Sequence, residues 1–182
     1  MQAALPAWGE RLALFYSPPH TLGMYVDGVQ RLDINAGLLV EYAPGLVCAA
    51  DCAAYAPLRA SLLAQVLGRD SIATTLSAMW VYTGYWPADR LIRICSVRAK
   101  SRTIRKPAPE ERQSIAGLCL TTLPRTITDI FRQEELDVAI TCALEVARQR
   151  LLEADGWEAA AENLTGRHLA AARAAVHAIA QR

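Results

Sequence analysis

The sequence predicts an α+β fold in two parts. Residues 1–50 are expected to form a winged-helix-like part of degenerate type, and residues 51–182 a mixed domain with a short, mostly antiparallel sheet and packed C-terminal helices. Three patterns favour this fold: two β-prone runs around Ala43-Pro44-Gly45, an apolar run that leads into an amphipathic helix after Pro124, and helical apolar spacing over the last third of the chain. The chain has 182 residues, 53% of them hydrophobic, which is enough for a substantial core.

The N-terminal part has the element order of a winged helix-turn-helix. Residues 1–20 predict a short helix closed by Pro18-Pro19, and Thr21 to Asn35 has helical apolar spacing interrupted by Gly23 and Gly28. The segment from Gly37 to Val47 then predicts a hairpin. Helix, helix and hairpin in this order are typical of a DNA-reading module.

The charges of this part argue against tight DNA binding. Asp27, Asp33 and Glu41 stand against a single arginine, Arg31, in the candidate recognition helix and hairpin. Protein–DNA affinity comes largely from phosphates neutralised by cations, so acids on the docking face oppose it. Whether the module binds DNA is therefore left open.

Two helices are predicted next. The first runs from Cys52 to Leu67 with Gly68 as its C-cap, and the second runs from Ser71 to Thr83. The second helix has one apolar face, so core packing of two antiparallel helices is expected, from Ile72, Leu76, Met79 and Trp80. The aromatic residues that follow are expected to cover a core edge, with an interface anchor as the alternative: Tyr82, Tyr85 and Trp86.

The densest positive charge of the chain follows these helices. Leu91 to Val97 predicts a strand, and Ser101 to Lys106 a second strand on a hairpin. Because the whole chain has a net charge of only +1, any attraction to a polyanion or an acidic protein is expected to come from this cluster. The candidate partner- or nucleic-acid-binding residues are Arg93, Arg98, Lys100, Arg102, Arg105 and Lys106. The alternative is an exposed edge hairpin whose charges prevent strand pairing.

The stretch from Gly117 to Arg132 is expected to organise the mixed domain. It begins as an apolar strand and becomes a helix, with Thr121 or Thr122 as N-cap and Pro124 in the first turn. Ile127, Ile130 and Phe131 are spaced to form the apolar face. Arg125 and Asp129 are four residues apart, so they predict an ion pair that orders the joint between strand and helix.

This stretch carries a resemblance to a known family. After the predicted strand, a Thr-Thr-x-Pro-Arg-Thr pattern with a following aspartate resembles the AbiEi-like antitoxins of AbiE-type (type IV) toxin–antitoxin systems. It also resembles the front half of related actinobacterial proteins that carry a nuclease-like C-terminal domain. The matching residues are Thr121, Thr122, Pro124, Arg125, Thr126, Asp129 and Ile130.

Weaker matches extend the resemblance to roughly residues 37–150. The hairpin matches the family's wing at Gly37, Tyr42, Gly45 and Leu46, and the second helix matches at Ser77, Ala78 and Gly84. Two departures lie in the wing, where Glu41 replaces a usual basic residue and Val47 a usual tyrosine.

The resemblance implies an antitoxin-like protein that binds a nucleotidyltransferase-like toxin partner, with possible autoregulation through duplex DNA. The alternatives are a standalone DNA-binding transcription regulator and a small enzyme with an unrecognised site. No enzyme is predicted, since the sequence has no Gly-rich phosphate loop, G-x-S-x-G or HExxH motif. The nuclease-type relatives need Glu-x-Lys, but neither Lys100 nor Lys106 has an acid two residues earlier. No cofactor or metal is expected.

The cysteines and the apolar runs indicate a cytoplasmic protein. Cys48, Cys52, Cys95, Cys119 and Cys142 are odd in number and scattered, which favours buried thiols in a reducing compartment over a zinc site. Glu10 and Arg11 interrupt the first apolar run, so no signal peptide is expected. No apolar span is long enough to cross a membrane.

Three helices are predicted after the organising stretch. The first, Glu134 to Leu152, should be ended by Asp155-Gly156 and is expected to bury one stripe, namely Leu136, Ala139, Ile140, Ala143, Leu144, Ala147 and Leu151. A short helix, Trp157 to Leu164, follows. The last helix begins near Thr165-Gly166 and should bury Leu169, Ala172, Val176 and Ile179.

Overall fold

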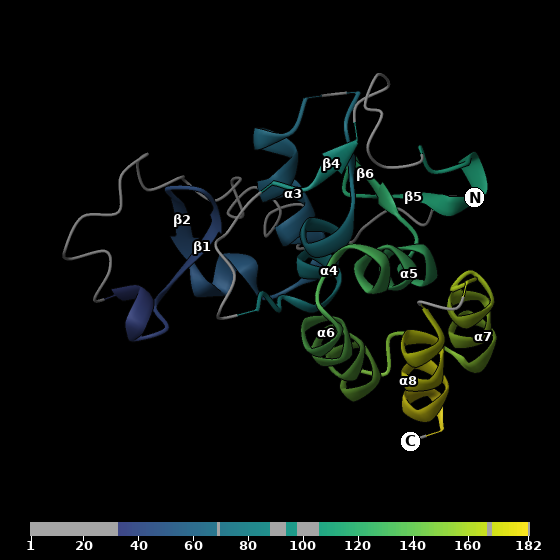
Figure 1. Cartoon of the computed structure of the whole chain (residues 1–182). Helices are drawn as coiled ribbons and strands as arrows, with labels where there is room; N and C mark the ends of the chain where they lie inside the picture. The colour runs from purple at the N-terminus through teal and green to yellow at the C-terminus, as the bar shows by residue number, and fades with distance from the viewer. Residues whose placement is uncertain (1–32, 69, 88–93, 98–105, 167–168, 182) are drawn as a thin grey trace, which may run out of the picture.

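A computed structural model describes residues 33–68, 70–87, 94–97, 106–166 and 169–181 of the chain (Figure 1). It confirms the predicted α+β class, with a two-stranded antiparallel hairpin, a four-stranded mixed sheet and helices packed against them. Helix α3 (Ala56–Val66) lies between the hairpin and the four-stranded sheet, and the three C-terminal helices lie beyond α5 (Leu123–Gln133) (Figure 1).

The predicted hairpin forms as β1 (Leu39–Ala43) and β2 (Leu46–Ala49). Gly45 supplies the turn with a φ of 73°, and its N–H donates to Glu41 Oε1 at 2.8 Å. Glu41, an acidic departure from the family pattern, therefore orders this turn. The two helices predicted before the hairpin lie outside the described residues, except for a last turn that ends where Gly37 N donates to Ile34 O.

The four-stranded sheet has the order β4–β3–β6–β5. Its strands are β3 (Ile72–Ala73), β4 (Ser96–Val97), β5 (Arg112–Ile115) and β6 (Leu118–Thr121). The β3–β6 pair is parallel, and the β3–β4 and β5–β6 pairs are antiparallel, so the predicted mostly antiparallel sheet is confirmed. Ala116 and Gly117 join β5 to β6 with φ angles of 46° and 81°, the pattern of a tight hairpin turn.

Three strands differ from the sequence-based prediction. Of the strand predicted over Leu91 to Val97, the described residues form only β4 (Ser96–Val97), with Ile94 and Cys95 outside it. Ile72 was assigned to a helix starting at Ser71, but it lies in β3, and α4 (Thr75–Thr83) begins after it. A two-residue strand shows no periodicity of its own, so Ile72 matched the helical apolar spacing of the helix that follows and was counted with it. Strand β5 was not predicted, because its residues lie at a sheet edge and are mostly polar.

The helices follow the predicted order with shifted ends. A 3₁₀ turn, η1 (Ala50–Ala53), precedes α3, and a second, η2 (Pro109–Glu111), precedes β5. Leu67 is the C-cap of α3, in extended conformation, so Gly68 does not have the predicted capping role. The C-terminal helices are α6 (Leu136–Arg148), α7 (Ala154–Glu162) and α8 (Ala170–Ala180). Gly156 lies inside the first turn of α7 instead of ending the preceding helix.

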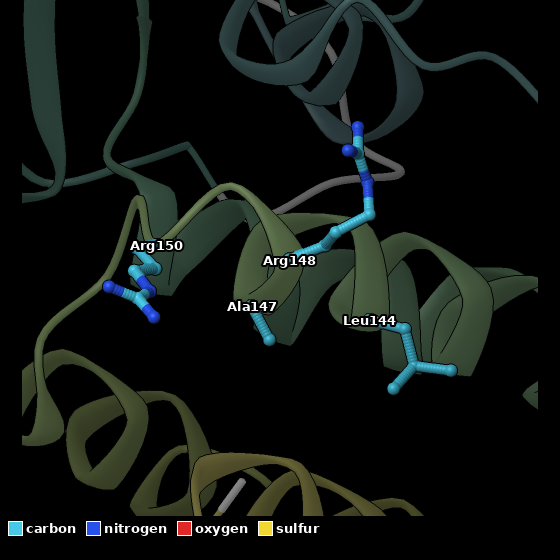
Figure 2. A pocket seen from close by; sticks show the side chains of 4 residues that line it. All are labelled: Leu144, Ala147, Arg148 and Arg150. Atoms are coloured by element: carbon cyan, nitrogen blue, oxygen red, sulfur yellow. The ribbon is translucent and has the colours of Figure 1, made fainter.

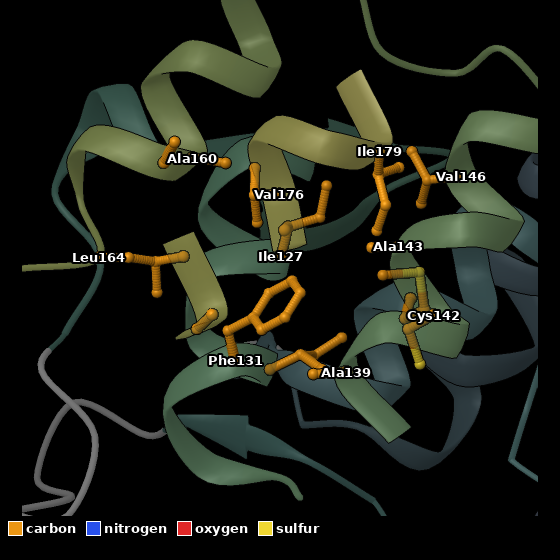
Figure 3. Close-up of a cluster of buried hydrophobic side chains, with 14 of the residues drawn as sticks. Ile127, Phe131, Ala139, Cys142, Ala143, Val146, Ala160, Leu164, Val176 and Ile179 are labelled. Carbon is orange, nitrogen blue, oxygen red and sulfur yellow. The ribbon is translucent and has the colours of Figure 1, made fainter. Parts of the chain in front are cut away.

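The core has two apolar clusters. One joins α4 and α5 to the C-terminal helices, where Ile127 and Phe131 of α5 point into the space that these helices enclose (Figure 3). The residues predicted to face inward on the last helix are all buried there: Leu169, Ala172, Val176 and Ile179.

The second cluster joins the β1–β2 hairpin to α3, α4 and β6. Tyr42 of the hairpin stacks on Trp80 of α4, with ring centroids 6.3 Å apart. The hairpin therefore shares its apolar contacts with the mixed domain. The predicted domain boundary near residue 50 stays a prediction.

Helix α6 buries a face that overlaps the predicted one only in part: Ala139 and Ala143 are buried as predicted. Its buried residues are Val138, Ala139, Cys142, Ala143 and Val146. Leu136, Leu144 and Leu151 are 44%, 37% and 41% exposed. The small residues Ala139 and Ala143, with Cys142, allow close contact with the core, and this choice of face turns the larger leucines outward.

Arg59 is a buried cation that the sequence did not indicate. Its side chain is 5% exposed and donates to four backbone carbonyls: Ala53 and Ala54 at 2.8 Å, Val81 at 2.9 Å and Tyr82 at 3.0 Å. Two of these carbonyls belong to the C-terminal turn of α4, where a cation complements the helix dipole. Burial lowers the pKa of Arg59, and this guanidinium ties η1 and α3 to α4.

Gly84 is predicted to be required beside Arg59. It ends α4 with a φ of 74°, and a Cβ there would lie 3.2 Å from Arg59 Nη1. Gly37 has nearly the same φ, 73°, with no atom within 4 Å of an added Cβ. Both Gly→Ala variants should lose about 1 kcal/mol from the left-handed backbone, and Gly84→Ala should lose more. Urea unfolding measures the difference, and equal losses would contradict the Arg59 contact.

Candidate functional site

The sequence predicted two groups of site residues, and the structure describes one of them. In the basic cluster, Arg93, Arg98, Lys100, Arg102 and Arg105 lie outside the described residues, and Lys106 is exposed. The motif residues Thr121, Thr122, Pro124, Arg125, Thr126 and Asp129 all lie within the described part. The joint between β6 and α5, called the β6–α5 joint below, is therefore the candidate site.

Threonines make the turn from strand to helix. Thr122 is the N-cap residue of α5, as one of the two predicted options, and Pro124 lies in the first turn. The Thr122 side chain makes no capping hydrogen bond. Instead, the hydroxyl oxygens of Thr121 and Thr126 lie 2.7 Å apart, and Thr126 Oγ1 donates to Thr122 O at 2.9 Å. The end of the strand is thus fastened to the first turn of the helix.

Arg125 forms the predicted ion pair with Asp129. Its Nε donates to both carboxylate oxygens of Asp129, at 2.9 and 2.8 Å. The pair is buried, with Arg125 6% and Asp129 2% exposed. The predicted ion pair is therefore present, and it lies much deeper than an ordinary ion pair on a helix surface.

Glu111 completes a triad that the sequence did not predict. Arg125 Nη1 donates to Glu111 Oε2 at 2.7 Å, and the same oxygen accepts the backbone N–H of Ala108 at 2.7 Å. Burial opposes the charge of Arg125, but the hydrogen bonds and charges of both carboxylates outweigh it and raise its pKa. Burial raises the pKa of Asp129, and the contact with Arg125 offsets part of that rise. The triad ties the segment before β5 to α5.

Tyr82 adds a second connection to the joint. Its hydroxyl donates to Thr121 O at 2.6 Å and accepts from Gln113 Nε2 at 2.6 Å. Burial is the main cause that raises the pKa of Tyr82, and the ring packs against both core clusters, as expected for a core edge. Neither Glu111 nor Gln113 carried a sequence signal, because their partners are distant in the chain and their own segment was not predicted as a strand.

The geometry of the joint favours positioning over chemistry. Thr126, Arg125 and Asp129 have at most 6% of their surface exposed, which leaves little room for a substrate to reach them. Their polar groups bind one another and nearby backbone. The joint fixes where α5 leaves the sheet, and α5 in turn supplies the centre of the larger core cluster.

The described part of the chain also has thiols and acids outside the joint. In residues that the structure describes, no group of three or more histidine, cysteine or acidic side chains is arranged to hold a metal ion. All five cysteines are free thiols; Cys48 and Cys142 are buried and the other three are half-buried. Burial raises the pKa of both Cys48 and Cys142 to about 12, which makes these thiols poor nucleophiles. Among the described helices, none has the length and apolarity to span a bilayer.

Comparison with known proteins returned no relative. No protein-family model, no curated protein and no solved structure matches this chain.

Proposed function

We propose that this chain is an antitoxin-like protein that binds a nucleotidyltransferase-like toxin, with autoregulation at duplex DNA as a second activity. We place its action in the cytoplasm, consistent with five free thiols.

The observation that carries the proposal is the β6–α5 joint. The residues on which the resemblance rests contact one another there: Thr121 meets Thr126, and Arg125 meets Asp129. The side chains of this motif bind one another, so the motif defines the local structure of the joint. This supports a structural framework shared with the antitoxins, and the binding of a toxin partner is inferred from that shared framework.

The β1–β2 hairpin favours the DNA-binding activity. Gly37 and Gly45 both have positive φ angles, so the glycines of the wing pattern are at positions that need them. Glu41, which opposes phosphate binding by its charge, is held within the turn by its bond to Gly45. A standalone transcription regulator is the second candidate function for this reason.

The antitoxin activity of this chain is tested by coexpression with a neighbouring gene for a nucleotidyltransferase-like protein. That protein alone should arrest growth, and this chain should relieve the arrest and copurify with it. Growth arrest that persists at equal levels of the two proteins would contradict the antitoxin function. Relief without copurification would contradict direct binding.

The same experiment includes a variant of the basic cluster. Neutralising Lys100, Arg102, Arg105 and Lys106 to alanine should abolish binding to promoter DNA or to the toxin. The sequence predicts these residues on an exposed hairpin, where charges contribute about 0–1 kcal/mol to stability, so the melting curve should be unchanged. Binding by wild type should weaken as salt rises, in titrations at two salt concentrations. Equal affinities of wild type and variant for DNA and for the toxin would mean that the charges of the cluster only prevent pairing of an edge strand.

A further inference from the structure

Helix α6 leaves a line of apolar side chains on the outside of the molecule. Leu136, Leu144 and Leu151 are exposed, and Ile140 and Ala147 between them are half-buried. We call these five residues the α6 stripe. The first four are three or four positions apart on α6, which is about 20 Å long, and Leu151 follows three residues after the helix ends.

A hollow of about 360 Å³ lies beside the C-terminal half of the stripe, lined by Leu144, Ala147, Arg148 and Arg150. Leu144 and Ala147 point to the same side of the helix, and Arg150 follows at its end, whereas Arg148 points away from them (Figure 2). Arg148 already binds Glu145 through two hydrogen bonds, at 2.8 and 2.6 Å. The hollow therefore has an apolar wall and one cation, Arg150, whose charge has no ion-pair partner among the described side chains.

The charges at the two ends of α6 are opposite. Asp137, in the first turn, is exposed and lies seven residues before Leu144, which places both on the same face. Arg148 and Arg150 lie at the other end. A second α6 placed antiparallel on the first would bring each acidic end to a basic end, whereas a parallel copy would bring like charges together.

We propose that the α6 stripe is the interface of a symmetric dimer, with α6 of a second copy packed antiparallel on it. Leu144 lies near the middle of the stripe, so the twofold axis passes beside it and the two Leu144 side chains meet. The hollow of each copy then faces Ile140, in the N-terminal half of the partner helix. Asp137, three residues before it, faces Arg150 across the interface.

The size of the stripe sets the strength of this dimer. A single helix pair of this length belongs to the small class of interfaces, so a dissociation constant on the order of micromolar or weaker is expected. Sedimentation velocity over a wide concentration range of the full chain alone is therefore the suitable measurement. Wild type should shift from monomer towards dimer as concentration rises.

Substitutions identify the interface. Leu144→Asp should keep the chain monomeric at all concentrations, with an unchanged melting curve. Leu38→Asp is the matched control, because Leu38 is 63% exposed and lies just before β1, not on α6, and it should leave dimerisation intact. Asp137→Arg and Arg150→Asp should each weaken the dimer by about tenfold. Together they should restore it, because each reversed charge then meets a reversed partner.

Three results would overturn the proposal. The first is a wild-type chain that stays monomeric at every concentration. This outcome includes a monomer whose α6 stripe binds the toxin instead, so that Leu144→Asp weakens toxin binding. The second is a dimer that survives Leu144→Asp or is lost equally with Leu38→Asp. The third is a charge-reversed double variant that dimerises no better than the single variants, which would exclude the antiparallel arrangement.

Discussion

Arg59→Met should lower the free energy of unfolding by about 3 kcal/mol or more. The guanidinium binds four carbonyls from two segments, and those of Ala53 and Val81 belong to buried residues. Methionine fills part of the volume but donates no hydrogen bond. Each buried carbonyl left without a donor costs about 1–3 kcal/mol, and water can reach the more exposed ones.

Urea unfolding of Arg59→Met measures this effect, and a matched control is available. Arg112 also donates to two backbone carbonyls, those of Pro107 and Ala108, but it is only half-buried. Arg112→Met should therefore lose about 1 kcal/mol. Arg59→Lys should fall between wild type and Arg59→Met, because an ammonium keeps the charge without the planar fork that reaches four acceptors. Similar losses for Arg59→Met and Arg112→Met would contradict the role given to burial.

Arg125→Met is expected to cost about 3–5 kcal/mol, because it leaves the carboxylate of Asp129 buried without its partner. Asp129→Asn should cost less, since Arg125 keeps its bond to Glu111. Replacing both residues, as Arg125→Met with Asp129→Leu, should recover much of the loss, because no uncompensated charge then remains.

The Arg125→Met variant should also have a distinctive pH dependence. Burial raises the pKa of Asp129, and removing Arg125 removes the contact that lowers it. A carboxyl whose pKa is higher in the folded state favours folding at low pH and loses that contribution as pH rises through the folded pKa. The variant should therefore be less destabilised at pH 5 than at pH 7. The same loss at both pH values, or an unchanged melting curve with loss of toxin binding, would contradict the positioning role of Arg125.

Local sequence patterns predicted the parts of the fold and site whose partners are close in the chain. Arg125 and Asp129 are one helical turn apart, and the β1–β2 hairpin turns within two residues, so spacing alone indicated both. The inward residues of the last helix followed from periodicity because that helix has one apolar face in an otherwise small-residue sequence.

The parts that were missed depend on distant or backbone partners. Arg59 binds carbonyls 22 and 23 positions away, and a carbonyl has no side-chain identity that a sequence can reveal. Glu111 lies in a segment that was not predicted as a strand, and its partner Arg125 is 14 positions away. Helix α6 has two apolar faces with the same helical spacing, so periodicity could not show which one is buried. The face with small residues is buried because it packs more closely against the core.

The parallel pairing of β3 with β6 has a consequence for the order of folding. The hairpins β1–β2 and β5–β6 close over a few residues, so they can form early and repeatedly. Strand β6 pairs with β3 across a long intervening stretch of sequence, and Tyr82 meets Thr121, 39 positions away. The entropy of closing that loop must be overcome before these contacts are made. The rate-limiting step of folding is therefore expected to be the docking of the β5–β6 hairpin and α5 onto β3 and α4, with the β6–α5 joint completed as that step ends.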